Sequence, residues 1–162
     1  MEVRELETGD LRFAWELNQR EVPHLGTETW DEFQRLCSIS ACRRLATAGS
    51  EPAGFLLGMT LDADYDSPNF LYFRERYTRV LYVDRIAVAA SVRKVGVGAS
   101  LYRDAERFAR GAGLHALCCE VNLQPPNPGS MAFHVRLGFS QVGEQLAHGK
   151  TVAMLVRQVG AP

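Results

Sequence analysis

The sequence predicts one compact domain of the α/β (α+β) class, and three observations support that prediction. The chain has 162 residues, of which 46% are hydrophobic and 23% are charged, so it is long enough to bury a real core and gives no indication of disorder. Segments with strand-like and helix-like patterns alternate along its whole length. No internal repeat or linker separates them, so we expect residues 1–162 to fold as a single unit.

The first third of the chain is expected to form three strands and two helices. Thr8-Gly9-Asp10 is a helix-start signal, and Pro23 and Gly26 end the helix that follows it. Gly49-Ser50-Glu51-Pro52 has the composition of a hairpin turn. In order, we expect a strand at 3–6, a helix to about residue 20, a second helix at 28–37, and strands at 43–48 and 53–61.

The segment from Asp62 to Arg79 is polar, contains Pro68 and shows no periodicity, so it predicts a long loop. It also carries five aromatic residues: Tyr65, Phe70, Tyr72, Phe73 and Tyr77. These aromatics either pin the loop to the protein surface or make it a lid over a substrate, and the sequence leaves both options open.

The second half begins with a strongly apolar strand and the clearest helix of the chain. The helix has apolar residues at helical spacing, and Gly111 and Gly113 end it. In order, we expect a strand at 80–88, this helix from about residue 97, a strand at 115–121, a helix at 128–137, a strand starting at 139–142, and a last strand at 151–158.

Charge and cysteine content exclude several classes of function. The formal net charge of −1 argues against a nucleic-acid-binding surface. No apolar run has the length of a signal region or a membrane span, which predicts a cytoplasmic protein without a membrane partner. The four cysteines lack metal-site spacing, so we expect buried free thiols and no metal.

The most informative motif is the loop Arg93-Lys94-Val95-Gly96-Val97-Gly98, which follows the strand ending at Val88 and opens the long helix. The first turn of a helix has unpaired N–H groups and a partial positive charge, so it favours a phosphate. The two glycines lack a Cβ that would keep a diphosphate away, although such glycines also serve tight packing. Walker A and dinucleotide motifs are excluded, because no Lys-Ser/Thr pair follows Gly98 and Leu101 stands at the third glycine position.

Three blocks together resemble the GNAT superfamily of acyl-CoA-dependent acyltransferases, in particular a poorly characterised bacterial branch. The loop of residues 93–98 is similar to the family's pyrophosphate loop. Asn127-Pro128-Gly129-Ser130-Met131-Ala132-Phe133-His134 looks like its Asn-x-x-Ala-x-x-hydrophobic-Tyr segment, and Leu137-Gly138-Phe139 matches the Leu-Gly-Phe that closes the last helix. Their order and spacing agree with the family.

This resemblance implies a mixed, mostly antiparallel sheet of six to seven strands with flanking helices and a splayed central cleft. The cleft would lie between the strands at 80–88 and 115–121 and would hold the pantetheine arm of acetyl-CoA, the expected co-substrate. The coenzyme A residues implied are Ile86, Ala87, Val88, Arg93, Lys94, Val95, Gly96, Val97, Gly98, Ala99, Asn127, Ser130 and Phe133.

The resemblance also raises the question of which group protonates the departing thiolate. The family often uses a Tyr near the start of the last helix, but His134 stands at that position here. An imidazolium can donate a proton near neutral pH, because the unperturbed pKa of His is about 6.5. The alternatives are a structural role for His134 and donation from Tyr82, Tyr102 or an ordered water.

Two carboxylates are candidates for the base that deprotonates the acceptor amine. Strand alternation predicts that Asp84 shares a face with Ile86 and Val88 and that it points away from its neighbour Arg85. Glu120, on the partner strand, is the rival. For either carboxylate the alternative role is an internal salt bridge.

The function expected is transfer of an acyl group, most simply acetyl, from acyl-CoA to an amine by direct attack in a ternary complex. The alternative is a non-catalytic acyl-CoA-binding or regulatory module. The partner is a small-molecule or peptide amine, and a homodimer is left open. Residues 18–24 and 62–79 are expected to line the acceptor side, where Arg74, Arg76 and Arg79 could attract a carboxylate.

Overall fold

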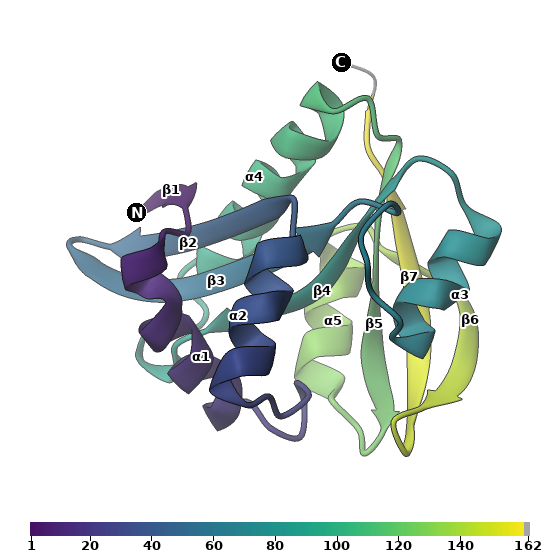
Figure 1. The fold of residues 1–162 in the computed structure, drawn as a ribbon, viewed down its shortest axis with the longest axis horizontal. Helices are drawn as coiled ribbons and strands as arrows, with labels where there is room; N and C mark the ends of the chain where they lie inside the picture. The colour runs from purple at the N-terminus through teal and green to yellow at the C-terminus, as the bar shows by residue number, and fades with distance from the viewer. Residues whose placement is uncertain (161–162) are drawn as a thin grey trace.

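A computed structural model describes residues 1–160, which form one seven-stranded sheet with five α-helices (Figure 1). Two short 3-10 turns, Thr8–Asp10 and Ala90–Val92, precede α1 and α4. The elements are β1 (Glu2–Glu5), α1 (Leu11–Arg20), α2 (Trp30–Ile39), β2 (Cys42–Ala48), β3 (Glu51–Met59), α3 (Pro68–Arg76), β4 (Val80–Val88), α4 (Val97–Gly111), β5 (Ala116–Gln124), α5 (Pro128–Arg136), β6 (Ser140–Ala147) and β7 (Lys150–Gln158).

The strands follow the order β1-β2-β3-β4-β5-β7-β6, and every neighbouring pair is antiparallel except β4 and β5. The parallel pairing of β4 with β5 covers only residues 80–82 and 116–118. Beyond these residues the two strands separate, although both continue for several residues. The mixed, mostly antiparallel sheet with a central splay is therefore confirmed.

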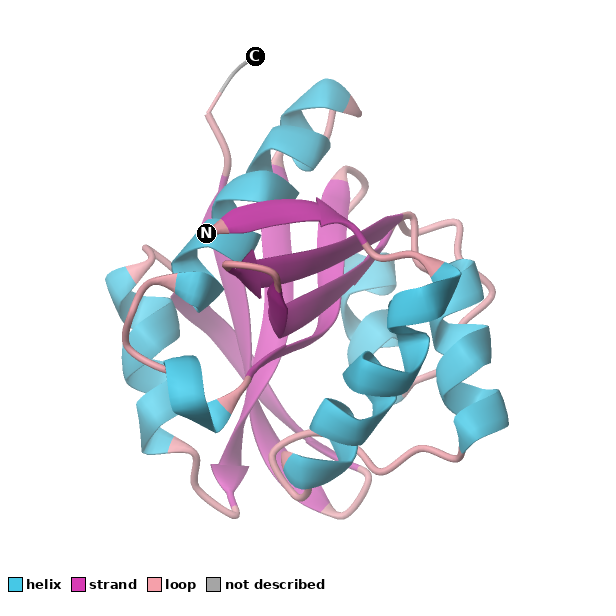
Figure 2. Cartoon of the chain, turned by 90° about the vertical axis from the view of Figure 1, so that its left-hand side faces the viewer, coloured by secondary structure: helices cyan, strands magenta, loops and turns pink. Residues whose placement is uncertain are grey.

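Helices cover both faces of the sheet and build two apolar cores (Figure 2). On one face α1, α2 and α3 contribute Leu17, Phe33 and Phe70, all less than 2% exposed. On the other face α4 contributes Leu101 and Ala105, which pack with residues of α5 and the sheet. None of the helices in residues 1–160 is long and apolar enough to cross a membrane.

The prediction of an unstructured loop at 62–79 is wrong, because this segment contains α3. Pro68 occupies the first turn of that helix, where its missing N–H costs nothing, and Phe70 and Phe73 lie one turn apart and are fully buried. The helix has only nine residues and ends in Arg-Glu-Arg, so its two buried aromatic residues are too few to produce a visible period. Its aromatic residues therefore anchor a helix against the sheet.

A β-bulge in β4 overturns a second prediction. Leu57 pairs with Arg85 and Gly58 pairs with Val83, so Asp84 has no partner in β3. The extra residue breaks strict alternation, and both Asp84 and Arg85 point to the face covered by α1 and α2, whereas Ile86 and Val88 pack on the opposite face. Asp84 thus does not share a face with Ile86, and it does not point away from Arg85.

Gly54 of β3 lies where the sheet leaves no room for a side chain. A Cβ at this position would lie 2.7 Å from the carbonyl oxygen of Ala87 on β4. We expect Gly54→Ala to lower the free energy of unfolding by about 2 kcal/mol, because the strand pair must move apart. Gly9→Ala is the control, since a Cβ there meets nothing within 4 Å, and it should change stability by less than about 0.5 kcal/mol. Urea unfolding measures both variants, and equal stability would contradict the packing argument.

Candidate active site

Two cavities lie side by side where β4 and β5 separate. The donor cavity, of about 140 Å³, is lined by residues 83–88 and 119–122 together with α4 and α5 side chains. The acceptor cavity, of about 480 Å³, is lined by residues 22–28, by Tyr65, Ser67 and Asn69, and by the turn between β6 and β7. Both are bordered by His24, Leu25, Asp84, Arg85, Glu120 and Asn122. These shared residues are where groups bound in the two cavities would meet.

The loop before α4 has the backbone geometry of an anion site. Lys94 and Gly96 adopt positive φ angles of 67° and 90°, and α4 begins at Val97 without a capping side chain. The first helical bond is donated by the N–H of Ser100 to Gly96, so in the described chain the N–H groups of residues 97–99 have no backbone acceptor. These free donors at the positive end of a 15-residue helix fit a diphosphate.

The two glycines of this loop have different roles. Gly96 needs its left-handed conformation, and a Cβ there would point into open space. A Cβ on Gly98 would instead lie 2.8 Å from Cζ of Phe133, so Gly98 allows α5 to pack against the start of α4. Tight packing, the alternative that the sequence left open for these glycines, therefore applies to Gly98, and its approach to a ligand stays a prediction.

Arg93 connects this loop to the segment after α1. Its guanidinium pairs with Glu21 and donates to the carbonyl oxygen of Val88 at 3.3 Å. Lys94 and Val95 are exposed on the rim, and Val97 is buried in the core. Of the loop residues, Arg93 is the one on the lining of the donor cavity.

Glu120 is a partly buried carboxyl group that forms no salt bridge within residues 1–160. Both of its oxygens accept the hydroxyl proton of Tyr82, at 2.9 and 2.8 Å. Burial, followed by the nearby charge of Asp84, raises the pKa of Glu120 to about 8, and hydrogen bonds from Tyr82 and Asn69 offset this only in part. A carboxyl with this pKa can exchange a proton near neutral pH, and it lies between the two cavities.

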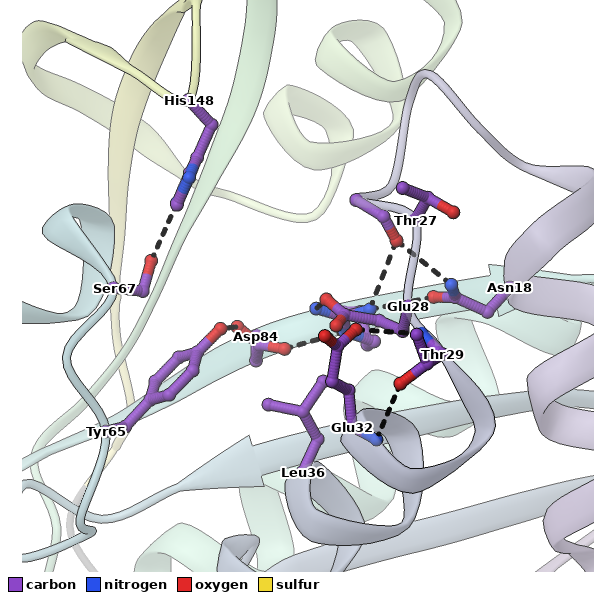
Figure 3. Close-up of polar contacts among 12 residues, drawn as sticks. Asn18, Thr27, Glu28, Thr29, Glu32, Leu36, Tyr65, Ser67, Asp84 and His148 are labelled. Atoms are coloured by element: carbon purple, nitrogen blue, oxygen red, sulfur yellow. Dashed lines mark hydrogen bonds and ion pairs between the residues drawn. The ribbon is translucent and has the colours of Figure 1, made fainter.

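Asp84 has a different environment, because it belongs to a network around Arg85. Nε of Arg85 donates to Asp84 at 2.7 Å, and its two other nitrogens donate to Asn18 at 2.9 Å and to Glu28 at 3.2 Å. The hydroxyl of Tyr65 donates to the other oxygen of Asp84 at 2.9 Å (Figure 3). Arg85 therefore ties β4 to the segment after α1 that borders the acceptor cavity.

His134 is 3% exposed and both of its ring nitrogens have partners. Its Nδ1 lies 2.8 Å from the carbonyl oxygen of Ser130, which can only accept, so this nitrogen carries a proton. Its Nε2 lies 2.7 Å from the hydroxyl of Tyr102. Burial lowers the pKa of His134, so the neutral ring that accepts a hydrogen bond from Tyr102 is the favoured form.

Asn127 and Ser130 lie at the start of α5 on the wall of the donor cavity. Oδ1 of Asn127 accepts the N–H of Ser130 at 3.4 Å, so Asn127 caps the helix while it borders the cavity. The hydroxyl of Ser130 lies 3.3 Å from Nδ1 of His134. Ser130, His134 and Tyr102 all line the donor cavity, so this row of polar groups runs along its wall.

Most residues singled out in the sequence gather at the donor cavity. Those on its lining are Asp84, Ile86, Ala87, Val88, Arg93, Glu120, Asn127, Ser130 and His134. Lys94, Val95, Gly96, Val97, Gly98, Ala99 and Phe133 form the neighbouring loop and helix contact instead. Residues 22–24 and Tyr65, Ser67 and Asn69 line the larger cavity, whereas Arg74, Arg76 and Arg79 do not. That this cavity takes the acceptor stays a prediction.

Several lining residues were not singled out from the sequence. From the sequence, Arg85 was expected to point to the face opposite Asp84. The β-bulge that places both side chains on the same face has no signature in the sequence. Asn122, His148 and Lys150 lie beyond the motif blocks, and only the order of the strands brings them to the site. The four cysteines are buried free thiols as predicted, and burial raises the pKa of Cys37 and Cys42 to about 11.

The mixed sheet, the separation of β4 from β5 and the free N–H groups at the start of α4 are the features expected of the acyltransferase family that the sequence resembles. The profile of the Acetyltransferase (GNAT) family matches residues 2–139. The chain therefore belongs to this family of acetyltransferases. No curated protein sequence matches it.

Solved structures with the same fold extend over nearly the whole chain. Ard1 from Thermoplasma volcanium superposes with a TM-score of 0.79 at 17% identity, covering 98% of this chain and 97% of that one. The ribosomal-protein-S18-alanine N-acetyltransferase from Escherichia coli gives 0.74 at 16% identity, with 99% and 95% covered. The putative acetyltransferase yncA from Salmonella typhimurium, solved with acetyl-CoA, gives 0.72 at 15% identity, with 100% and 95% covered. At these identities the similarity establishes the fold.

The Arg85 network generates a prediction for stability. Arg85→Gln leaves Asp84 and Glu28 buried without their cation, so we expect the free energy of unfolding to fall by about 3 kcal/mol. Arg43→Gln breaks the exposed pair with Glu5 and should cost less than about 1 kcal/mol. Urea unfolding at neutral pH compares the two variants. If both lose the same small amount, the network does not hold the site together.

Proposed function

We propose that this protein transfers an acetyl group from acetyl-CoA to the amine of a small molecule or peptide by direct attack in a ternary complex. The observation that supports this most is the contact between the donor and acceptor cavities at Glu120. An amine in one cavity and a thioester in the other would meet there, and holding two reactants together supplies much of the rate of such reactions. A cytoplasmic location and the absence of a nucleic-acid partner remain part of this proposal.

The donor would be held by the loop before α4 and by the edges of β4 and α5. The free N–H groups of residues 97–99, with Arg93 and Lys94 beside them, fit the diphosphate. The backbone of Ile86, Ala87 and Val88 at the parted edge of β4 is available for the pantetheine arm, and Asn127 faces it from α5. Acetyl-CoA brings the reactive thioester, and the chain supplies its orientation.

Glu120 is the proposed base. An acceptor amine reaches the site protonated and must lose one proton before it attacks and another afterwards. Glu120 borders both cavities and has a pKa of about 8, whereas Asp84 is held in its ion pair with Arg85. We therefore assign proton removal to Glu120 and assign Asp84 to orienting Arg85 and maintaining the negative potential at the site.

His134 is proposed to act on the departing thiolate through Ser130. Tyr102 donates to Nε2 of His134, and the Nδ1–H of His134 faces both the carbonyl oxygen and the hydroxyl of Ser130. Each hydrogen bond in such a row polarises the next one. The hydroxyl of Ser130 thereby becomes a stronger hydrogen-bond donor toward the thioester sulfur of bound acetyl-CoA. In this role His134 orients and polarises Ser130 and stays a neutral imidazole.

The base assignment predicts a specific pH dependence. Because Glu120 must be deprotonated to accept a proton, kcat/KM for the acceptor should rise with pH through an apparent pKa near 8. Glu120→Gln should lower kcat/KM by about 10²- to 10³-fold and remove this limb, leaving only the ionisation of the acceptor amine. Steady-state release of CoA thiol between pH 6 and 10 measures both effects.

Asp84→Asn is the matched control for this experiment, because it removes a carboxylate that borders the same two cavities. The limb should persist in this variant but move to lower pH, because the charge of Asp84 is one of the causes that raise the pKa of Glu120. A profile that loses the limb in Asp84→Asn and keeps it in Glu120→Gln would reverse the assignment.

The role of His134 predicts a separation of turnover from binding. His134→Ala, Ser130→Ala and Tyr102→Phe should each lower kcat with acetyl-CoA by about ten- to a hundredfold, while the Kd for acetyl-CoA changes by less than about threefold. Calorimetry gives Kd and thiol release gives kcat. With p-nitrophenyl acetate as the donor, whose phenolate leaves without needing a proton, the loss should be much smaller. An equal loss with both donors would indicate a purely structural role.

A further inference from the structure

The charged groups around the acceptor cavity are sorted by depth. Three carboxyl groups, those of Glu28, Asp84 and Glu120, lie on its inner side beside β4 and β5. Lys150 and two histidines, His24 and His148, border it from the loop after α1 and from the turn between β6 and β7. The side chains of Asp84 and Glu28 are 3% and 19% exposed, whereas His24 and His148 are exposed and Lys150 is half-buried. Figure 3 shows His148 beside Ser67, away from Asp84 and Glu28. The cavity therefore has an acidic inner side and a basic mouth.

Among the three inner carboxyl groups, Glu120 is the one that could pair with a cationic ligand. The single guanidinium of Arg85 lies between Asp84 and Glu28 and is paired with both. Glu120 receives hydrogen bonds only from neutral groups, chiefly the hydroxyl of Tyr82. An ammonium group next to Glu120 would supply the cation that this carboxyl lacks, so the amine end of an acceptor is oriented toward it.

The basic groups at the mouth are not neutralised by the protein. In residues 1–160 none of Lys150, His24 and His148 forms a salt bridge with a carboxylate. Nζ of Lys150 donates to the carbonyl oxygen of Pro23, which leaves further donors on the same ammonium, and Nε2 of His148 lies 3.3 Å from the hydroxyl of Ser67. Lys150 is half-buried and is one of only two lysines in the chain.

Resting on the proposed function, we propose that the acceptor is a small amino acid, whose amine faces Glu120 and whose carboxylate is bound at the mouth by Lys150 and His148. A carboxylate would complete the charge-assisted hydrogen bonds that these groups lack. A diamine or polyamine would place a second ammonium beside Lys150 and would be repelled. The volume of about 480 Å³ accommodates a ligand of amino-acid size.

The test compares matched acceptors at fixed acetyl-CoA. Thiol release is measured with L-amino acids and their amides, with ω-amino acids from glycine to 6-aminohexanoate, and with simple amines and diamines of the same lengths. We expect the carboxylate-bearing member of the best pair to have a kcat/KM at least tenfold higher than its uncharged partner. Diamines should be the poorest acceptors.

Variants at the mouth assign the preference to particular residues. Lys150→Gln should lower kcat/KM for the amino acid about tenfold and leave kcat/KM for its amide unchanged, and Lys150→Arg should restore most of the preference. Arg74→Gln is the control, because Arg74 is exposed on α3 and does not border the cavity. It should leave both acceptors unaffected.

The possible results separate the inference from the function on which it depends. Equal rates for amino acids and amides, or a preference for diamines, would overturn the amino-acid acceptor while thiol release still supported an acetyltransferase. A preference that persists in Lys150→Gln would overturn the assignment of the carboxylate to the mouth. Acetyl-CoA binding without thiol release for any amine would contradict the proposed mechanism and this inference together.

Discussion

The separation of β4 from β5 is the constraint on which the rest of the site depends. Their parallel ladder ends after Tyr82 and Cys118. Beyond this point the facing edges of β4 and β5 do not pair with each other. An unpaired buried edge is costly unless a ligand or water satisfies it, which makes the gap a natural place for an extended ligand. The same gap brings Glu120 within reach of both cavities.

The bulge at Asp84 gives this gap its electrostatic character. By turning two consecutive side chains to one face, it buries the guanidinium of Arg85 beside the carboxylate of Asp84. Arg85 is then neutralised internally and holds the segment after α1 through Asn18 and Glu28. Burial and the charge of Asp84 raise the pKa of Glu120 more than Arg85 and the hydrogen bonds lower it. The sequence alone could not rank Glu120 above Asp84, and this environment makes Glu120 the better base candidate.

The sequence predicted features that depend on local backbone conformation better than features that depend on where side chains point. The glycine loop, the start of α4 and the Asn127 segment could be recognised because their function needs a fixed local conformation. Alternation failed at β4 because one inserted residue shifts every later side chain to the other face. The helix α3 escaped notice because two turns with two buried aromatics produce no period. From the sequence, Tyr102 could be named only as an alternative to His134 as the proton donor. Its contact with His134 joins two helices and is visible only in three dimensions.

These differences explain why the donor is easier to infer than the acceptor. In the proposed function the diphosphate is recognised by N–H groups that any sequence supplies once α4 begins at the right place, so a short motif is enough to predict the site. The acceptor cavity is built from the loop after α1, the segment before α3 and the turn before β7, which are far apart in the chain. Loops of this kind accept changes without loss of the fold, so their side chains can set specificity independently of the donor site. For this reason the unpaired charges at the mouth are more informative about the acceptor than membership of the family is.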